Sequence, residues 1–250
     1  MVTIYKVNTL FTIHYSLKII LRRLLNILPL VLLLLIVIVA VISWIANVYG
    51  ANCRNILSSE GMRWTVEMIM DNFNRSPWTY IVVGLASLSM IVESGIISGF
   101  SKQKYLRQRR AYMLVAVVMA VIAALALILY LLPGNSLLSA FGTFNNSALQ
   151  RGFFPIIAVL LYMLSLIYAF AIGRFNDIED VIKATVNITV RIPGYFITLF
   201  VASQLIAVIL YSFFIDYNLS LPMPTSVKIL AVILYGIPLI LHLLTLKQKQ

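Results

Sequence analysis

Long apolar runs, separated by short charged segments, are the dominant pattern along this chain of 250 residues. A membrane-spanning helix needs about 20 consecutive, mostly apolar residues. The pattern predicts six such helices, over residues 24–49, 77–100, 111–132, 152–173, 192–214 and 229–246. The uncharged block 111–150 is too long for one helix, and Pro133-Gly134-Asn135 breaks it after the third span. We therefore predict an all-α polytopic membrane protein in which residues 1–250 form a single membrane domain.

Two shorter segments have the pattern of amphipathic helices. Apolar residues recur at helical spacing over about 58–73, and Ser58 is a suitable N-cap for that helix. A second amphipathic helix is predicted over about 177–190, with Asn176 as its cap and Glu179 as the reciprocal acid. Glu179 and Lys183 stand four residues apart in the favourable order, which predicts a weak ion pair.

The distribution of Lys and Arg predicts the orientation of the chain. These residues are concentrated in the N-terminal tail, in segments 101–110 and 174–191 and in the C-terminal tail, and are sparser in the alternate segments. Loops rich in Lys and Arg normally remain in the cytoplasm. Both termini and the 177–190 helix are therefore predicted to be cytoplasmic, and the 58–73 helix is predicted to be external.

Composition narrows the class of protein and excludes several functions. With 62% hydrophobic residues, 11% charged residues and a mean hydropathy of +0.99, the chain lies outside the range of soluble domains. The net charge of +11 reflects the cytoplasmic loops, and no basic run is interleaved with aromatic residues as nucleic-acid binding requires. We expect a multi-pass membrane protein whose partner is the lipid bilayer rather than nucleic acid.

No arrangement of residues in the sequence suggests catalysis, a metal or a cofactor. Cys53 is the single cysteine, so an intrachain disulfide and a cysteine-based metal cluster are excluded. His14 and His242 lie far apart and have no nearby carboxylate or cysteine. No triad, paired carboxylates or glycine-rich phosphate loop is present, and we predict that the protein is not an enzyme.

Two polar residues within the predicted spans are candidates for contact with a substrate or an ion. Glu93 is the one acid inside a span, where a charge is costly, and it is either a coupling or substrate residue or a structural glutamate near the interface. Gln204 lies in the middle of the fifth span and either bonds to another helix or contacts substrate.

Small residues in two spans predict close helix packing. Gly95 and Gly99 form a GxxxG pattern at the end of the second span, and Ala116, Ala120 and Ala124 form a stripe on the third. Such residues allow two helix backbones to approach closely, within a monomer or in a dimer.

Several ordered motifs resemble the aminobenzoyl-glutamate (AbgT) transporter family over roughly residue 36 to the C-terminus. They are Leu57-Ser58-Ser59-Glu60-Gly61-Met62-Arg63-Trp64, Val92-Glu93-Ser94-Gly95, the segment from Leu149 to Ile157, Pro193-Gly194-Tyr195-Phe196-Ile197, Ser203-Gln204 and Gly236-Ile237-Pro238. The resemblance implies a bacterial inner-membrane homodimer that moves a small organic anion, such as p-aminobenzoyl-glutamate, by coupling to an ion gradient.

The chain also departs from the family pattern, and the departure leaves a second hypothesis. Full-length family members are longer and carry two re-entrant hairpins. This sequence has no equivalent of the first hairpin between Phe100 and Leu132 and no equivalent of the second after Gly236-Ile237-Pro238. The chain therefore resembles a shortened member that lacks the hairpin segments. The alternative to a transporter is a transport-incompetent scaffold or partner subunit that retains the framework helices, and a second chain would then supply the missing hairpins.

Overall fold

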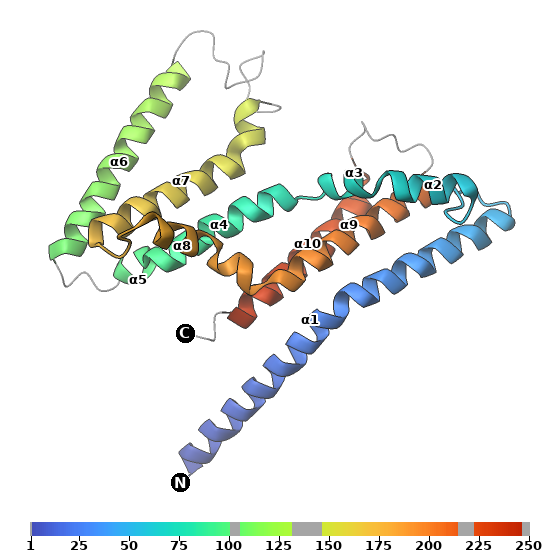
Figure 1. Ribbon diagram of the computed structural model, residues 1–250, viewed down its shortest axis with the longest axis horizontal. Helices are drawn as coiled ribbons and strands as arrows, with labels where there is room; N and C mark the ends of the chain where they lie inside the picture. The colour runs from blue at the N-terminus through green and yellow to red at the C-terminus, as the bar shows by residue number, and fades with distance from the viewer. Residues whose placement is uncertain (1, 101–105, 132–146, 215–222, 247–250) are drawn as a thin grey trace. The chain divides into compact units, whose positions relative to one another are not determined.

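The computed structural model describes residues 2–100, 106–131, 147–214 and 223–246. Every regular element among these residues is an α-helix (Figure 1): α1 (Val2–Val48), α2 (Ser59–Glu67), α3 (Ile69–Asn74), α4 (Trp78–Ser94), α5 (Ile96–Phe100), α6 (Leu106–Leu131), α7 (Ala148–Ile172), α8 (Ile178–Arg191), α9 (Pro193–Phe213) and α10 (Thr225–Leu246).

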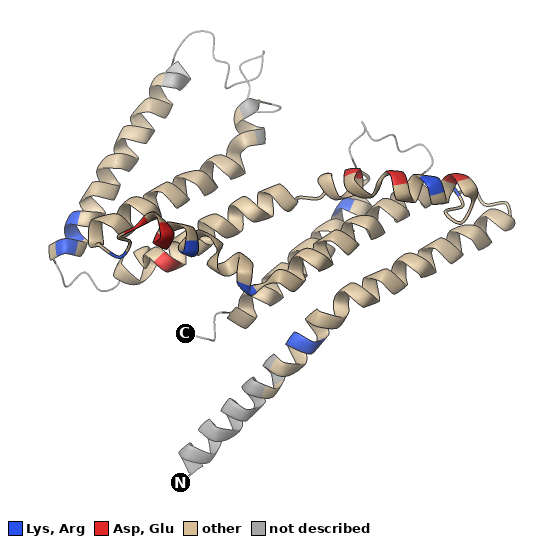
Figure 2. Ribbon diagram, viewed as in Figure 1, with Lys and Arg blue, Asp and Glu red and all other residues tan. Residues whose placement is uncertain are grey.

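Six segments of these helices are long and apolar enough to cross a membrane, as the hydrophobic pattern predicts. They are Ile19–Val48, Trp78–Gly99, Leu106–Ile128, Gly152–Ile172, Pro193–Phe213 and Thr225–Leu246. Charged residues gather near the ends of these segments, for example at the start of α6 (Figure 2). The protein is therefore an all-helical, multi-pass membrane protein, and the prediction of its fold class is confirmed.

The helices form two compact units, each made of segments that are distant in sequence. Residues 1–78 and 192–250 form the first unit, and residues 79–191 form the second. The first unit therefore contains α1, α2, α3, α9 and α10, whereas the second contains α4, α5, α6, α7 and α8.

In the first unit, α9 is the central helix. It packs against α1, α10 and α3, and most of its side chains are buried. Leu32 of α1 packs with Val201, Ala202 and Leu205 of α9, whereas Val227 and Ala231 of α10 pack with Ile206 and Leu210. Because α9 is surrounded by apolar partners, it is the span that is least able to face lipid.

The segment that follows α1 returns along α9. It begins where the N–H of Arg54 donates to the Ser212 carbonyl at 2.9 Å, near the C-terminus of α9. Trp64 of α2 then stacks on Tyr211 with ring centroids 4.2 Å apart, and Phe73 of α3 contacts Phe200 with centroids 5.5 Å apart. The segment therefore runs antiparallel to α9 and is not confined to the end of that helix.

Where the sequence pattern predicts one helix over about 58–73, the structure has α2 and α3. Ser58 is the N-cap, and its hydroxyl accepts a hydrogen bond from the Gly61 N–H at 3.1 Å. The helical path is interrupted at Met68, whose φ of −93° and ψ of 4° lie outside the helical range. Apolar spacing continues through Met68, so the sequence pattern contains no sign of the interruption.

In the second unit, α8 folds back along α7. The turn between them contains Gly173, which has a φ of +69° and ends α7 in the left-handed conformation. Ala184 of α8 packs in one buried cluster with Ala169 of α7 and Met90 of α4. The hydroxyl groups of Tyr162 and Thr185 are 2.9 Å apart, and Tyr162 lies at the midpoint of the span Gly152–Ile172. α8 therefore reaches the middle of α7.

Candidate functional site

The second unit contains a charged pocket beside an interruption in a span. Residues 78–99 are apolar enough to form one continuous helix, but the helix stops at Ser94 and restarts as α5 at Ile96. Gly95, between the two, has a φ of +72°, a conformation that L-residues rarely adopt. The Ser94 hydroxyl accepts a hydrogen bond from the Ile96 N–H at 3.3 Å and supports the new start.

Glu93, in the last turn of α4, is half-buried, and its carboxylate has a partner on α8. The side-chain amide of Asn187 donates a hydrogen bond to Glu93 Oε1, and Asn187 Oδ1 accepts one from Arg191 Nε at 2.8 Å. A carboxylate inside a span is costly unless it is paired or solvated. The amide of Asn187 and the adjoining pocket reduce that cost.

A further hydrogen-bond pair holds α8 against α4, one turn before Glu93. The Ser89 hydroxyl donates to the Ala184 carbonyl at 2.5 Å and accepts from the Ile188 N–H at 3.2 Å. Ser89 is fully buried. Because both contacts involve the α8 backbone, they set the position of Asn187 relative to Glu93.

The pocket has a volume of about 390 Å³ and side chains of both charges. Glu93, Arg174, Phe175, Asp180, Lys183, Ala184 and Asn187 line it. Two carboxylates and two cations around one cavity can bind an ionic ligand and can also exchange partners when that ligand leaves.

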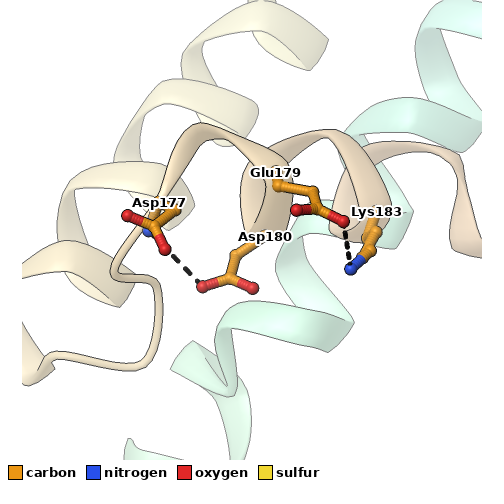
Figure 3. Close-up of polar contacts among 4 residues, drawn as sticks. All are labelled: Asp177, Glu179, Asp180 and Lys183. Atoms are coloured by element: carbon orange, nitrogen blue, oxygen red, sulfur yellow. Dashed lines mark hydrogen bonds and ion pairs between the residues drawn. The ribbon is translucent and has the colours of Figure 1, made fainter.

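Two of the charged side chains of the pocket also lie close to residues that do not line it. Arg174 lies so close to Gly95 that a Cβ at that position would overlap its guanidinium group. Lys183 Nζ forms an ion pair with Glu179 Oε1 at 2.6 Å (Figure 3), and both side chains are well exposed. The predicted Glu179–Lys183 pair is therefore present.

Asp180 has a structural role at the start of α8 (Figure 3). Its Oδ2 accepts hydrogen bonds from the N–H groups of Asn176 at 3.1 Å and Asp177 at 3.5 Å. These bonds hold the pKa of the Asp180 carboxyl below its usual value because they stabilise the ionised form. Glu179 was the predicted reciprocal acid of this cap, and the assignment is wrong by one residue because the helix begins at Ile178.

Gln204 lies in the first unit, does not line this pocket and contacts α3. Its Nε2 donates to the Ile69 carbonyl at 2.9 Å, and its Oε1 accepts from Asn72 Nδ2 at 3.3 Å. Gln204 follows Pro193 by eleven residues and precedes Phe213 by nine, so these contacts lie near the middle of α9. Gln204 was predicted either to bond to another helix or to contact substrate, and the structure contains a bond to another helix.

The small residues differ in their surroundings. A Cβ at Gly99 would overlap the Tyr168 hydroxyl of α7 and would come within 2.9 Å of the Tyr112 hydroxyl, so this glycine lies at a close helix approach. Ala116, Ala120 and Ala124 are exposed along α6. His242 is buried, with Nδ1 at 2.8 Å from the Pro238 carbonyl, whereas the side chain of His14 lies outside the described part.

Sequence reasoning singled out Glu93 but not the residues that surround it. Asp180, Lys183 and Asn187 are spaced at i, i+3 and i+7, which places them on one face of α8. That polar stripe was the feature of the sequence that could have identified these three residues as part of a site. The sequence pattern could not indicate that the stripe faces the end of α4, because it contains no information on which helix packs against which.

No family model, curated protein or solved structure matches the chain.

Proposed function

We propose that this protein is an inner-membrane secondary transporter that moves a small organic anion by coupling to an ion gradient. The observation that carries the proposal is the broken span α4–α5, which has Glu93 in its last turn beside a charged pocket. Interrupted helices with polar side chains are typical of transport sites, because irregular backbone within a membrane is tolerated where it lines a cavity.

The side chains of the pocket suggest separate roles in anion binding and in coupling to the gradient. Arg174 and Lys183 can attract a carboxylate, and Glu93 can bind or release a proton or metal cation as the gradient requires. The resemblance to the AbgT family favours p-aminobenzoyl-glutamate, which carries two carboxylates, as the first anion to test. The lipid bilayer and a second copy of the chain are the partners that this proposal includes.

A scaffold subunit that moves nothing is the second candidate, and α6 is the observation that favours it. Between Ala111 and Ile128 this helix has one polar side chain, Tyr112, and most of its residues are exposed. A surface of this kind can pack against another chain as well as against lipid. Under this hypothesis, a second chain contributes the transport site.

Uptake into proteoliposomes tests the proposal. Purified protein is reconstituted, a sodium or proton gradient is imposed, and accumulation of radiolabelled p-aminobenzoyl-glutamate is followed over time. We expect gradient-dependent accumulation, and we expect the initial rate to fall by at least about tenfold in Glu93→Gln because the ionisable group is lost. Asn187→Ala should lower the rate less, since it removes a partner of Glu93 and keeps the charge.

Glu67→Gln is the matched control, because Glu67 is an exposed acid on α2 in the other unit, and its rate should equal that of the unaltered protein. Absence of gradient-dependent uptake of any dicarboxylate by the pure protein would reject transport by this chain alone. Recovery of uptake after addition of a partner co-purified from native membranes would then support the scaffold hypothesis.

A further inference from the structure

The two halves of the chain contain spans and short helices in the same order, with α2 and α3 together corresponding to α8, and α4 and α5 together corresponding to α9. Each half begins with a span that ends near a glycine of positive φ, namely Gly50 at +78° after α1 and Gly173 at +69° after α7. A short helix then packs against a span, as α3 does against α9 and α8 does against α4. A proline precedes or begins the next span, and a third span follows.

Residues at corresponding places in the two halves are also alike. Each short helix carries an asparagine, followed at close spacing by Arg-x-Pro, and an Ala-Ser pair follows the proline at the same distance in both halves. The first set is Asn72, Arg75, Pro77, Ala86 and Ser87, and the second is Asn187, Arg191, Pro193, Ala202 and Ser203. The prolines thus set a common register for the two following spans.

Hydrogen bonds at the two short helices follow one pattern. In α3, the Ile69 carbonyl accepts from a span side chain, and Asn72, three residues later, donates to a side-chain Oε1. In α8, the Ala184 carbonyl accepts from a span side chain, and Asn187, three residues later, donates to a side-chain Oε1. Gln204 makes both contacts in the first unit, whereas Ser89 and Glu93 share them in the second.

The composition of the two units follows from the same correspondence. The first unit combines the first span and short helix of the N-terminal half with the second and third spans of the C-terminal half. The second unit combines the first span and short helix of the C-terminal half with the second and third spans of the N-terminal half. If each helix is replaced by its counterpart in the other half, the helices of the first unit become those of the second. Such a composition is expected when two equivalent halves exchange the same elements with each other.

We infer that the chain consists of two inverted repeats, residues 2–131 and 148–246, and that the Asn72–Gln204 contact is the counterpart of the Asn187–Glu93 contact. Each repeat contributes three spans, and an odd number of crossings gives the second repeat the opposite orientation in the membrane. α3 and α8 therefore fold back from opposite faces of the membrane. If the proposed function holds, the uncharged Asn72–Gln204 contact has, in the first unit, the role that the Asn187–Glu93 contact has in the second.

Sidedness of two matched cysteines tests the inversion. In a Cys53→Ser background, Asn52→Cys and Asn176→Cys place single thiols at exposed positions two and three residues after the equivalent glycines. A membrane-impermeant maleimide should label one of them in right-side-out vesicles and the other in inside-out vesicles. Labelling of both thiols from the same face would overturn the inverted repeat.

Depth of the two short helices tests their equivalence. Met70 and Val186 are exposed, and each follows a residue that bonds to the middle of a span. Spin labels at the two positions should both show high oxygen accessibility and low accessibility to a water-soluble relaxing agent, as expected within the hydrocarbon core. An aqueous signal from either label would reject the equivalence. Neither measurement uses cargo, so failure of transport leaves both results interpretable.

Discussion

At the scale of single residues, two polar side chains of the spans have partners on another helix. Glu93 accepts from Asn187, and Gln204 contacts both Ile69 and Asn72. A polar group without a partner in an apolar environment costs several kcal/mol, so such contacts determine which helix faces pack together. By contrast, the exposed Glu179–Lys183 pair contributes at most about 0.5 kcal/mol, because water screens it.

The cap at Asp180 predicts a specific dependence of stability on pH. The pKa of Asp180 is lower in the folded protein than its ordinary value, because two backbone N–H groups stabilise the carboxylate. Its contribution to stability is therefore complete above the ordinary aspartate pKa and is lost as pH falls through the lower, folded value. Thermal unfolding of Asp180→Asn in detergent should begin at a lower temperature than that of the unaltered protein at neutral pH.

The difference between Asp180→Asn and the unaltered protein should shrink as the solution is acidified, because protonation removes the charge that the substitution removes. Asp71→Asn is the control, since Asp71 is an exposed acid in the first turn of α3. A constant difference in midpoint across the whole pH range would show that the carboxylate of Asp180 is not the group responsible.

At the scale of elements, the spans could be predicted and the paths of the short helices could not. Charges limit the apolar runs, except that Pro133-Gly134-Asn135 ends the third, so the approximate bounds of the spans are visible in the sequence. Amphipathic spacing identifies the apolar face of α8, but lipid and another helix satisfy an apolar face equally well. The return of α8 to Tyr162 depends on long-range contacts that spacing does not encode.

The break at Gly95 was not predicted either, because GxxxG is also the pattern of two closely packed helices. Gly95→Ala should lower the free energy of unfolding by about 1–2 kcal/mol, since its φ of +72° strains an L-residue. The new methyl group would also meet Arg174. Chemical or thermal unfolding in detergent measures the change.

Gly236→Ala is the matched control for Gly95→Ala. Gly236 lies within α10, and a Cβ added there has no heavy atom within 4 Å. Alanine is the better helix former by about 1 kcal/mol, so this substitution should leave stability unchanged or raise it. An equal loss of stability in both variants would mean that the left-handed conformation at Gly95 is not required.

At the scale of the whole molecule, the two halves have the same succession of spans and short helices. This repetition accounts for the presence of helices from both halves in each unit. The Asn-Arg-Pro spacing was present in the sequence, but its meaning depends on the contacts that α3 and α8 make. The pocket at Glu93 likewise requires three separate segments, 93, 174–175 and 180–187. No single segment contains enough of the pocket to predict it.

Protection of a cysteine by cargo tests most directly whether the pocket in the second unit is the binding site. In a Cys53→Ser background, Lys183→Cys places a thiol in the pocket and leaves Arg174 as the cation that attracts the anion, whereas Ile182→Cys places a thiol on the neighbouring exposed position of α8. We predict that p-aminobenzoyl-glutamate slows maleimide labelling at position 183 and leaves the rate at position 182 unchanged. Equal labelling rates at position 183 with and without the anion, in protein that still transports it, would contradict the account.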